Sequence, residues 1–445
     1  MENKTIYALS TVFGKSGVAV IRISGSEVKN IISKVIDLDI NKIKPRHAYF
    51  INLKDNVTRE TIDKCLILYF NAPHSFTGED VLEIQCHGSK AVLNSVFKNL
   101  SNINNVRLAE PGEFSKRAFY NNKMDLTEAD GLADLIDAET SEQQKYAIRQ
   151  MEGNLKNLYY SWREELVRIL SYLEAYIDFP EEEISKDLYD NILNTVFKVK
   201  SEIKNHLNNN NVNERLKNGF RVVIAGKTNA GKSSLINALT KKNTMIVSDI
   251  EGTTRDAVDI NLDINGFPII ITDTAGIRNT DNKIEKMGID IALEKIKTAD
   301  IIIALYDASK EIFDDNILPS KTKNILYVAN KVDKISNDER IKILNKSHFL
   351  LSTKSGEGLL EITEKITSII RDKINPSSNL LITRERYRIY LNECLIMLEN
   401  FSLEKEIELS AEDIRLACRA IGKITGEVKV DEILDNIFSS FCIGK

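Results

Sequence analysis

One stretch of the sequence limits the possible folds more than any other. Residues Gly226–Ser233 read G-K-T-N-A-G-K-S, which matches G-x-x-x-x-G-K-[ST], and they follow the segment 221–225, which is predicted to be a buried strand. In this pattern backbone N–H groups wrap a phosphate, Lys232 reaches the β- and γ-phosphate oxygens, and the Ser233 hydroxyl binds Mg²⁺. The chemistry needs a strand, a tight loop and a helix in that order, which predicts a doubly wound α/β domain.

Three further motifs follow in the order that a GTP site needs. Asp273-Thr274-Ala275-Gly276 comes after an apolar strand, so its carboxylate can hold the Mg²⁺ shell and its glycine N–H can reach the γ-phosphate. Asn330-Lys331-Val332-Asp333 follows another strand, and a carboxylate there can accept both N–H groups of a guanine edge, which adenine does not supply. Ser352-Thr353-Lys354 would support the base through its backbone. Together these motifs predict GTP binding.

A loop that closes over the γ-phosphate is expected between the phosphate-loop helix and the next strand. Residues 248–256 occupy this place, and a threonine hydroxyl there can complete the Mg²⁺ coordination. The full set that we expect to bind GTP is Asn229, Ala230, Gly231, Lys232, Ser233, Ser234, Ser248, Asp249, Ile250, Glu251, Gly252, Thr253, Thr254, Asp273, Thr274, Ala275, Gly276, Asn330, Lys331, Asp333, Ser352, Thr353 and Lys354.

The residue that orients the attacking water is not the usual one. Many small GTPases carry a glutamine just after the Asp-x-x-Gly element, and Ile277 stands at that position here. Ile277 has no hydrogen-bonding side chain, so another group must act. Arg278 and Glu285 are the nearest polar candidates.

The part of the chain before this domain shows two different sequence patterns. Residues 1–120 combine short β-rich runs, such as 18–21 and 65–70, with helical spacing over 28–36. This mixture predicts a small α+β domain. From residue 121 onward long stretches with almost no glycine or proline, such as 130–176, predict the helices of a bundle.

Helical spacing returns after the α/β segment, over 380–401 and 411–441. Because helices flank the α/β segment on both sides, we expect one helical domain interrupted by an insertion. The predicted fold class is therefore multidomain α/β plus all-α, with a P-loop GTPase domain inserted in a helical bundle. The expected boundaries are 1–120 for the amino-terminal domain, 121–217 with 376–445 for the helical domain, and 218–375 for the G domain.

Composition excludes some classes of protein. The net charge of −5 and a pI of about 5.8 argue against a protein that coats nucleic acid through phosphate attraction. Five widely spaced cysteines without a C-x-x-C pair are typical of reduced thiols rather than of disulfides or a zinc site. No apolar run approaches the roughly 20 residues of a membrane span, and Met1–Lys4 does not begin a signal peptide. We therefore expect a cytoplasmic protein without a membrane segment.

A second string also reads N-K-x-D. Asn122-Lys123-Met124-Asp125 lies about a hundred residues before the phosphate loop and follows 117–120, which is no buried strand. We therefore predict that it starts a helix and does not bind guanine.

The chain resembles the tRNA modification GTPases of the MnmE or TrmE family over essentially its whole length. The most specific matching segments are Ile21–Gly25, Ser75–Glu83, Pro111–Ser115, Asn229–Ser234, Glu251–Asp256 and Phe441–Lys445.

The resemblance implies an amino-terminal domain that binds folate and forms a homodimer. It also implies that the chain works with an FAD-dependent partner of the MnmG or GidA type, in a heterotetramer or a larger complex. The complex would place an aminomethyl or carboxymethylaminomethyl group on carbon 5 of the wobble uridine, position 34, of tRNA. A 5-formyl- or methylene-tetrahydrofolate would supply the one-carbon unit, and K⁺ would activate GTP hydrolysis when the G domains pair.

The resemblance also implies roles for single residues. Glu285 would orient the attacking water through a second water, which answers the question raised by Ile277. Cys442 matches the terminal cysteine of the family and is associated with the site without being assigned as a nucleophile. The implied ligands are Ser233 and Thr254 for Mg²⁺; Asn229, Ser248, Ile250 and Thr253 for K⁺; and Arg22, Glu83, Lys123 and Lys445 for folate.

Two other classes of protein remain open from the residues alone. A ribosome-assembly GTPase acting as a binding switch would share Asn229 and Ile277, but it would normally carry a basic RNA-binding module, which this acidic chain lacks. A folate-dependent one-carbon enzyme with a regulatory G domain would have no role on RNA. Unchanged wobble uridines in a strain that lacks the chain would exclude the tRNA role.

Overall fold

The computed structural model of the chain describes residues 4–36, 38–179, 185–208, 213–227, 229–245, 259–273, 294–310, 324–374, 382, 384–428, 437–438, 441 and 444. The chain forms two compact units, of which one comprises Met1–Ala133 with Ile421–Lys445 and the other comprises Asp134–Ala420. Within the described ranges, none of the helices combines the length and the apolar character needed to cross a bilayer.

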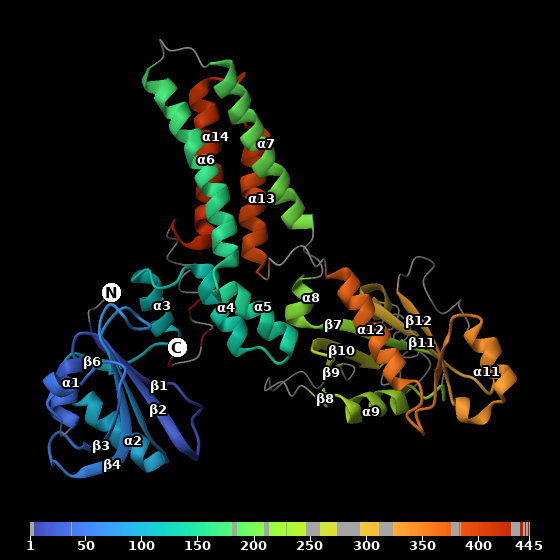
Figure 1. Ribbon diagram of the computed structural model, residues 1–445, viewed down its shortest axis with the longest axis horizontal. Helices are drawn as coiled ribbons and strands as arrows, with labels where there is room; N and C mark the ends of the chain where they lie inside the picture. Colours follow the sequence, from blue (N-terminus) through green and yellow to red (C-terminus); the bar gives the residue numbers. More distant parts are fainter. Residues whose placement is uncertain are drawn as a thin grey trace, which may run out of the picture. The chain divides into compact units, whose positions relative to one another are not determined.

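A six-stranded sheet forms the body of the first unit (Figure 1). Side chains alternate along its strands, so that Ile21 and Ile23 are buried in the core while Arg22 between them is partly exposed. The buried face packs against α1 (Val28–Val35) and α2 (Lys90–Ser101). In order across the sheet the strands are β3 (Ala48–Lys54), β4 (Thr61–Phe70), β5 (Val81–Gly88), β2 (Ser16–Ser24), β1 (Thr5–Leu9) and β6 (Val106–Leu108).

The first unit also contains the short helices η1 (Ile40–Lys42), α3 (Glu113–Tyr120) and the first part of α4 (Leu126–Ile136). The helix start predicted at the second N-K-x-D string is confirmed at α4. Asp125 Oδ1 accepts the Glu128 N–H at 2.8 Å, and Glu128 Oε2 accepts the Asp125 N–H at 2.7 Å. This reciprocal pair satisfies N–H groups that the first helical turn leaves open.

Long helices of the second unit form the predicted bundle (Figure 1). In α6 the buried residues recur at steps of four and three, which places them on one stripe of the helix. The same steps occur in α7 and α13. The helices are α6 (Asn154–Asp178), α7 (Lys186–Asn208), α13 (Glu385–Asn400) and α14 (Ile407–Thr425), preceded in the chain by α5 (Ser141–Met151).

One helix prediction is wrong at its end. The sequence predicts helix over 411–441, whereas α14 stops at Thr425. The backbone turns at Gly426, where φ is +87°. Further on, Phe438 and Phe441 pack with Phe119 in a separate cluster of the first unit. Phe438 and Phe441 therefore serve tertiary packing, which their spacing does not distinguish from a helix stripe.

The fold class is confirmed by a mostly parallel seven-stranded sheet between α7 and α13 in the chain. Among the strands that the structure describes there, β9 runs antiparallel to β10 and β8 antiparallel to β9, while the other pairs are parallel. In order the strands are β13 (Phe349–Leu351), β12 (Ile325–Asn330), β11 (Ile301–Asp307), β7 (Phe220–Ala225), β10 (Phe267–Asp273), β9 (Asp259–Ile264) and β8 (Thr244–Met245). The accompanying helices are α8 (Asn213–Asn218), α9 (Lys232–Lys242), η4 (Val332–Lys334), α11 (Asn337–Leu344) and α12 (Leu359–Lys373).

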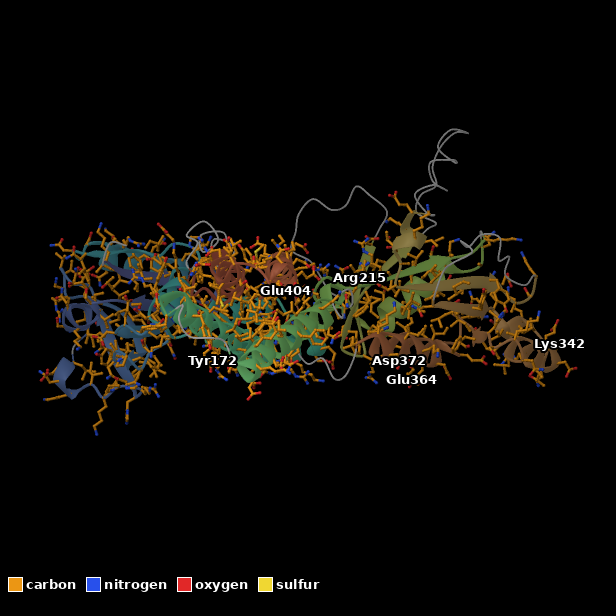
Figure 2. All side chains as sticks on the ribbon, turned by 90° about the horizontal axis from the view of Figure 1, so that it is seen from above. Tyr172, Arg215, Lys342, Glu364, Asp372 and Glu404 are labelled. Carbon is orange, nitrogen blue, oxygen red and sulfur yellow. The ribbon has the colours of Figure 1, made fainter. Side chains whose placement is uncertain are left out.

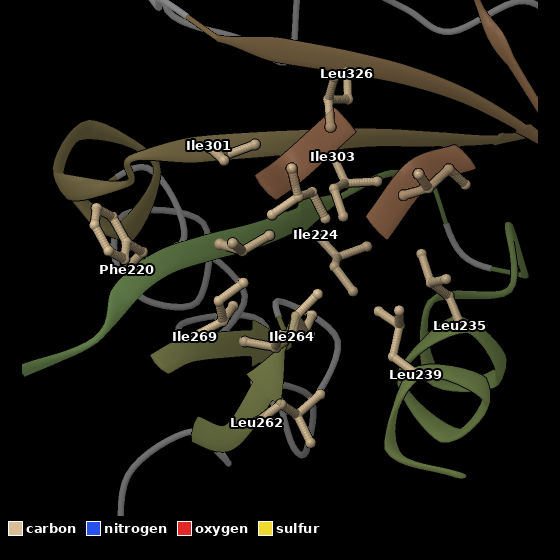
Figure 3. Packing of buried hydrophobic residues seen from close by; sticks show 14 of the residues in the cluster. Phe220, Ile224, Leu235, Leu239, Leu262, Ile264, Ile269, Ile301, Ile303 and Leu326 are labelled. Atoms are coloured by element: carbon tan, nitrogen blue, oxygen red, sulfur yellow. The ribbon is translucent and has the colours of Figure 1, made fainter. Parts of the chain in front are cut away.

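The central strand of this sheet is buried on both sides. Phe220, Val222 and Ile224 of β7 pack with Leu235 and Leu239 of α9 in a large hydrophobic cluster (Figure 3). Parallel strands covered by helices on both faces need such continuous apolar runs. The carboxyl end of β7 is thereby held rigidly where the phosphate loop begins.

A histidine inside the bundle should make its stability depend on pH. Burial lowers the pKa of His206 from 6.5 to about 4. Although the residue as a whole is partly exposed, its ring is enclosed by Tyr159 and Trp162. Between these pKa values the unfolded chain takes up a proton that the folded bundle does not, so the stability that is present above pH 6.5 falls as the pH falls.

We expect the free energy of unfolding of the bundle to fall by about 2 kcal/mol between pH 7 and pH 5 through this group. His206→Gln should remove this part of the dependence. Trp162 is the only tryptophan of the chain and lies beside the histidine, so its fluorescence during urea unfolding reports this region. His74→Gln, at an exposed histidine, is the matched control. Equal pH profiles for His206→Gln and the wild type would contradict the assignment.

Candidate functional site

The phosphate loop lies between β7 and α9, as its sequence predicts. Gly231 caps α9 with a φ of +100°, and a Cβ at this position would come within 2.2 Å of Asn330 Nδ2. Only glycine combines this backbone angle with this close approach. Lys232 Nζ donates to the carbonyl of Gly226 at 2.7 Å, so the ammonium lies over the loop. The amino terminus of α9 therefore offers N–H groups and a positive charge, which together suit a phosphate.

The first serines of α9 stand beside this loop. Ser233 and Ser234 occupy its first turn, and both are exposed. An exposed hydroxyl at this point is a suitable oxygen ligand for Mg²⁺, which prefers oxygen donors.

Asn330 joins the phosphate loop to the predicted base-binding loop. Its side chain is fully buried; Nδ2 donates to the carbonyl of Ala230 at 2.8 Å, and Oδ1 accepts the Thr353 N–H at 3.3 Å. Residues 230, 330 and 353, each of which lies in a different predicted motif, thus meet at one amide. Because the amide is buried, losing either bond would leave a polar group unsatisfied.

Lys331 makes a second connection. Its ammonium donates to the carbonyl of Asn229 at 2.8 Å and to Asp307 Oδ2 at 2.7 Å. Burial raises the pKa of Asp307, but the hydrogen bonds from Lys331 and Ser309 outweigh this effect and lower it overall. Asp307 therefore stays charged and fixes Lys331 on the phosphate loop. Sequence reasoning missed Asp307, although a carboxylate that ends a buried strand beside β12 is a recognisable signal.

The carboxylate that we expect to bind guanine is exposed to solvent. Asp333 is exposed, and its Oδ1 accepts the Ser352 hydroxyl at 2.9 Å. This hydrogen bond lowers the pKa of Asp333. Lys354 is also exposed. The residue before it, Thr353, donates its N–H to the Asn330 side chain. The Asp333 carboxylate is thus oriented and ionised, so its oxygens can accept hydrogen bonds from the two N–H groups of a guanine edge.

Other predicted residues are placed only in part. The backbone of Asp273 ends β10 opposite Ile224, near the start of the phosphate loop, while its side chain lies outside the described part of the chain. The remaining predicted residues outside the described ranges are Ser248, Asp249, Ile250, Glu251, Gly252, Thr253, Thr254, Thr274, Ala275, Gly276, Arg278, Glu285, Cys442 and Lys445.

A second candidate site lies in the first unit, on the sheet face opposite to the one that α1 and α2 cover. Arg22 and Glu83 are cross-strand neighbours, and Arg22 Nε donates to Glu83 Oε1 at 3.0 Å. The guanidinium lies over the rings of Phe76 and Phe114, at 5.4 and 5.9 Å from their centres. An arginine held between a carboxylate and two aromatic faces is rigid, and it can recognise a planar, polar ligand.

Two further segments approach this region of the first unit. The stem of Lys123 lies against Gly78, in the loop that also carries Phe76. The carbonyl of Gly444 accepts the Ser10 hydroxyl at 3.1 Å, so the carboxyl-terminal segment returns to the end of β1. The structure thus brings Lys123 to the Phe76 loop and Gly444 to the strand beside β2.

A partly buried charge network, centred on the buried Glu113 and Arg117, supports the same loop, and sequence reasoning missed it. Arg117 donates to Glu79 at 2.9 Å and to Glu113 at 3.0 Å, and Glu113 also accepts from Arg107 at 2.7 Å. Burial raises the pKa of Glu113, but these arginines and the Glu110 N–H outweigh it and lower the pKa. No sequence signal distinguishes these four charged residues from surface charges, because their burial depends on the fold.

Replacing Asp333 by asparagine tests the assignment of the base site. The amide would place a donor where guanine also has a donor, so we expect the affinity for GDP to fall at least about tenfold. Affinity for xanthosine diphosphate, which carries an oxygen at carbon 2, should rise. Titrations with fluorescent nucleotides measure both affinities. Asp338→Asn changes an exposed acid of the same domain and should leave both unchanged; a GDP affinity unchanged by Asp333→Asn would refute the assignment.

The chain is similar to proteins of known families over most of its length. Residues 5–123 match the family described as GTP-binding protein TrmE N-terminus, and residues 126–442 match the MnmE helical domain. The tRNA modification GTPase MnmE of Rickettsia prowazekii (strain Madrid E) is 44% identical over 446 residues, which cover 99% of this chain and all of the relative. The Orientia tsutsugamushi (strain Boryong) protein of the same name is 45% identical over 450 residues, covering all of both chains.

Among solved structures, the G domain of the T. maritima FeoB iron transporter is similar to 34% of this chain and 98% of its own length. The sequence identity is 27%, and the TM-score is 0.25.

Proposed function

The chain belongs to the MnmE family of tRNA modification GTPases, and from that premise we propose a specific reaction for it. It is a GTP hydrolase that takes part in tRNA modification. In our proposal it places an aminomethyl or carboxymethylaminomethyl group on carbon 5 of the wobble uridine, position 34. The observation that carries the proposal is the meeting of the phosphate loop, Asn330 and Thr353 at one nucleotide site in a chain similar to this family throughout.

The one-carbon unit would come from 5-formyl- or methylene-tetrahydrofolate bound to the first unit. Arg22 and Glu83 would bind the planar pterin, to which a carboxylate and a guanidinium offer complementary acceptors and donors. Lys123 and Lys445 would pair with negative charge on the folate. The placement of Lys123 on the Phe76 loop and of Gly444 beside β1 supports this proposal. Cys442 would lie near the same ligand without acting as a nucleophile.

Hydrolysis would use two metal ions and an acid. Ser233 and Thr254 would hold Mg²⁺, while Asn229, Ser248, Ile250 and Thr253 would hold K⁺. The site fits these ions at the residues that can be placed: the Ser233 hydroxyl is exposed, and the exposed Asn229 has its carbonyl fixed by Lys331. Bound cations would supply charge stabilisation for the phosphates. By resemblance to the family, Glu285 would orient the attacking water through a second water, which fits the lack of a hydrogen-bonding side chain at Ile277.

The proposed assembly is a homodimer that works with an FAD-dependent protein of the MnmG or GidA type, in a heterotetramer or a larger complex, in the cytoplasm. Because this chain carries a net charge of −5, its partner would supply part of the tRNA-binding surface. We also propose the division into an amino-terminal domain (1–120), a helical domain (121–217 and 376–445) and a G domain (218–375).

Potassium activation is testable at one residue. We expect GTP turnover to be severalfold faster in K⁺ than in Na⁺ at equal ionic strength, and Asn229→Ala to abolish the difference, because it removes a proposed ligand oxygen. Phosphate release measures both rates. Asn345→Ala replaces an exposed asparagine of the same domain and should keep the difference. Equal wild-type rates in both salts would count against the K⁺ site.

The proposed reaction is tested on the tRNA itself. In a strain that lacks the chain, mass spectrometry should find the carbon-5 substituent missing from wobble uridines. Wild-type protein should restore it, and Lys232→Ala should not, because this variant loses the contact to the phosphates. Unchanged uridines in the deletion strain would exclude the tRNA role and favour a ribosome-assembly or purely folate-dependent function.

A further inference from the structure

The helices and the inserted α/β part of the second unit meet at the first turn of α5. The Glu142 N–H donates to the carbonyl of Gly266 at 3.1 Å, in the turn between β9 and β10. A Cβ at Gly266 would lie 2.4 Å from Ser141 Oγ, and the φ of Gly266 is +89°. The Ser141 hydroxyl therefore occupies the place that a Cβ at Gly266 would take.

This contact satisfies a group that the helix cannot satisfy itself. The Glu142 N–H is among the first four of α5, which have no acceptor within the helix. Thr140 Oγ1 accepts the N–H of Gln143, so the side-chain cap serves the next residue and not Glu142. The carbonyl of Gly266 is thus the acceptor that completes this helix end.

The same turn of α5 holds the segment by which the chain enters the α/β part. Gln143 Nε2 donates to the carbonyl of Lys217 in α8 at 3.0 Å, while Gln143 Oε1 accepts the Thr140 N–H at 3.0 Å. One turn further along, Tyr146 packs in the hydrophobic cluster of the α/β part together with Leu216. α5 is therefore attached to the inserted part at the β9–β10 turn, and to α8, which leads into that part.

One carboxylate, that of Asp134, forms ion pairs with both linkers, the two segments that connect the helices with the α/β part. Asp134 Oδ1 accepts Lys217 Nζ and Arg384 Nη2, each at 2.9 Å, and the Asp134 side chain is only 8% exposed. Lys217 precedes β7, where the chain enters the α/β part, and Arg384 precedes α13, where it has returned. The two linkers are therefore fixed to one point of α4.

A second acidic residue, Asp300, holds both linkers from the α/β side, through its carboxylate and its backbone carbonyl. Asp300 Oδ2 lies 3.3 Å from Arg215 Nε of α8, which Figure 2 labels, and Lys373 Nζ at the end of α12 donates to the Asp300 carbonyl at 3.0 Å. Arg215 and Lys217 are two residues apart, which places them on nearly opposite sides of a helix. α8 is thus held by the α/β part on one side and by α4 on the other.

The β9–β10 turn is connected to the parts of the chain that should sense the nucleotide. β9 and β10 pair over six residue pairs, from Phe267↔Ile264 to Thr272↔Asp259, about 20 Å of ladder. The predicted switch residues 248–256 precede β9, and the Asp-x-x-Gly element follows directly from β10. The hairpin therefore connects the nucleotide end of the sheet with Gly266.

We propose that the first turn of α5, residues 140–143, is the joint through which the nucleotide state of the G domain repositions the helical domain. Gly266, Ser141 and Gln143 are positioning residues in this joint. Asp134 holds both linkers beside it through Lys217 and Arg384. The inference rests on the proposed function for its biological role. The joint itself is testable without tRNA.

Hydrogen exchange at the Glu142 amide tests the joint directly, because Gly266 supplies its acceptor. In the wild type we expect protection to differ at least about fivefold between protein saturated with GDP and with a non-hydrolysable GTP analogue. Gly266→Asn adds a Cβ against Ser141 while asparagine tolerates positive φ, so it should abolish the difference. Ser141→Ala in the same chain removes the Oγ and should restore it. Equal protection in both nucleotide states of the wild type would overturn the proposal.

Gly356→Asn is the matched control, because Gly356 has a φ of +84° and an added Cβ would meet nothing within 4 Å. An equal effect of this control on the Glu142 amide would also overturn the proposal. Should Gly266→Asn not fold, Gln143→Glu replaces it, since a carboxylate keeps the capping acceptor but loses the donor to Lys217. A nucleotide-dependent difference of wild-type size in Gln143→Glu would then refute the joint.

The activity readout separates the joint from the proposed function. In Gly266→Asn, GTP hydrolysis should stay within about twofold of the wild type, while tRNA modified per GTP hydrolysed falls at least about fivefold. Loss of GTP hydrolysis in step with modification would reassign Gly266 to the structure of the G domain. If the wild type hydrolyses GTP but modifies no tRNA, the proposed function fails, and the exchange experiment still decides on the joint.

Discussion

The nucleotide site depends on the buried side-chain amide of Asn330. Its two hydrogen bonds reach Ala230 and Thr353, so the phosphate loop and the base loop cannot move apart without leaving a buried polar group unsatisfied. Such a loss costs about 1–3 kcal/mol, a large part of what keeps a domain folded. The same amide approaches Gly231 closely enough to exclude any side chain there. One interaction therefore explains why two motifs a hundred residues apart need asparagine and glycine.

The motifs of this site are predictable because each keeps its chemistry within a few consecutive residues. A glycine loop before a helix, or a carboxylate three residues after an asparagine, can be recognised without knowledge of the fold. Asp307 is different, because its role arises from the parallel pairing of β11 with β12, which sets Asp307 opposite Asn330 and beside Lys331. Because Asp307 and Lys331 lie far apart in the sequence, their contact cannot be predicted from it, although the strand that carries Asp307 can.

Elsewhere local patterns predict the type of element better than its limits. The helix start at Asp125 follows from a capping pair four residues long, whereas the end of α14 follows from Gly426, after which apolar residues pack on Phe119. Arg22 and Glu83 lie opposite each other because of the antiparallel register of β2 and β5, and no local sequence signal specifies this register. The family resemblance supplies these residues, and the sheet gives the physical reason why they act as a pair.

The energy scale of the α5 contact suits a joint that must switch. A continuous hydrophobic interface of domain-core size would hold the two parts as one rigid body, and no plausible difference between nucleotide states would displace it. Here, beside the packing of Tyr146 with Leu216, the turn at Gly266 contributes one backbone hydrogen bond and Gln143 another. Each of these hydrogen bonds is worth about 0.5–1.5 kcal/mol. Coupling free energies of about 1–3 kcal/mol are of the same size. The ion pairs of Asp134 and Asp300 can meanwhile keep the linkers attached, so the contact at α5 can open while the chain crossings stay in place.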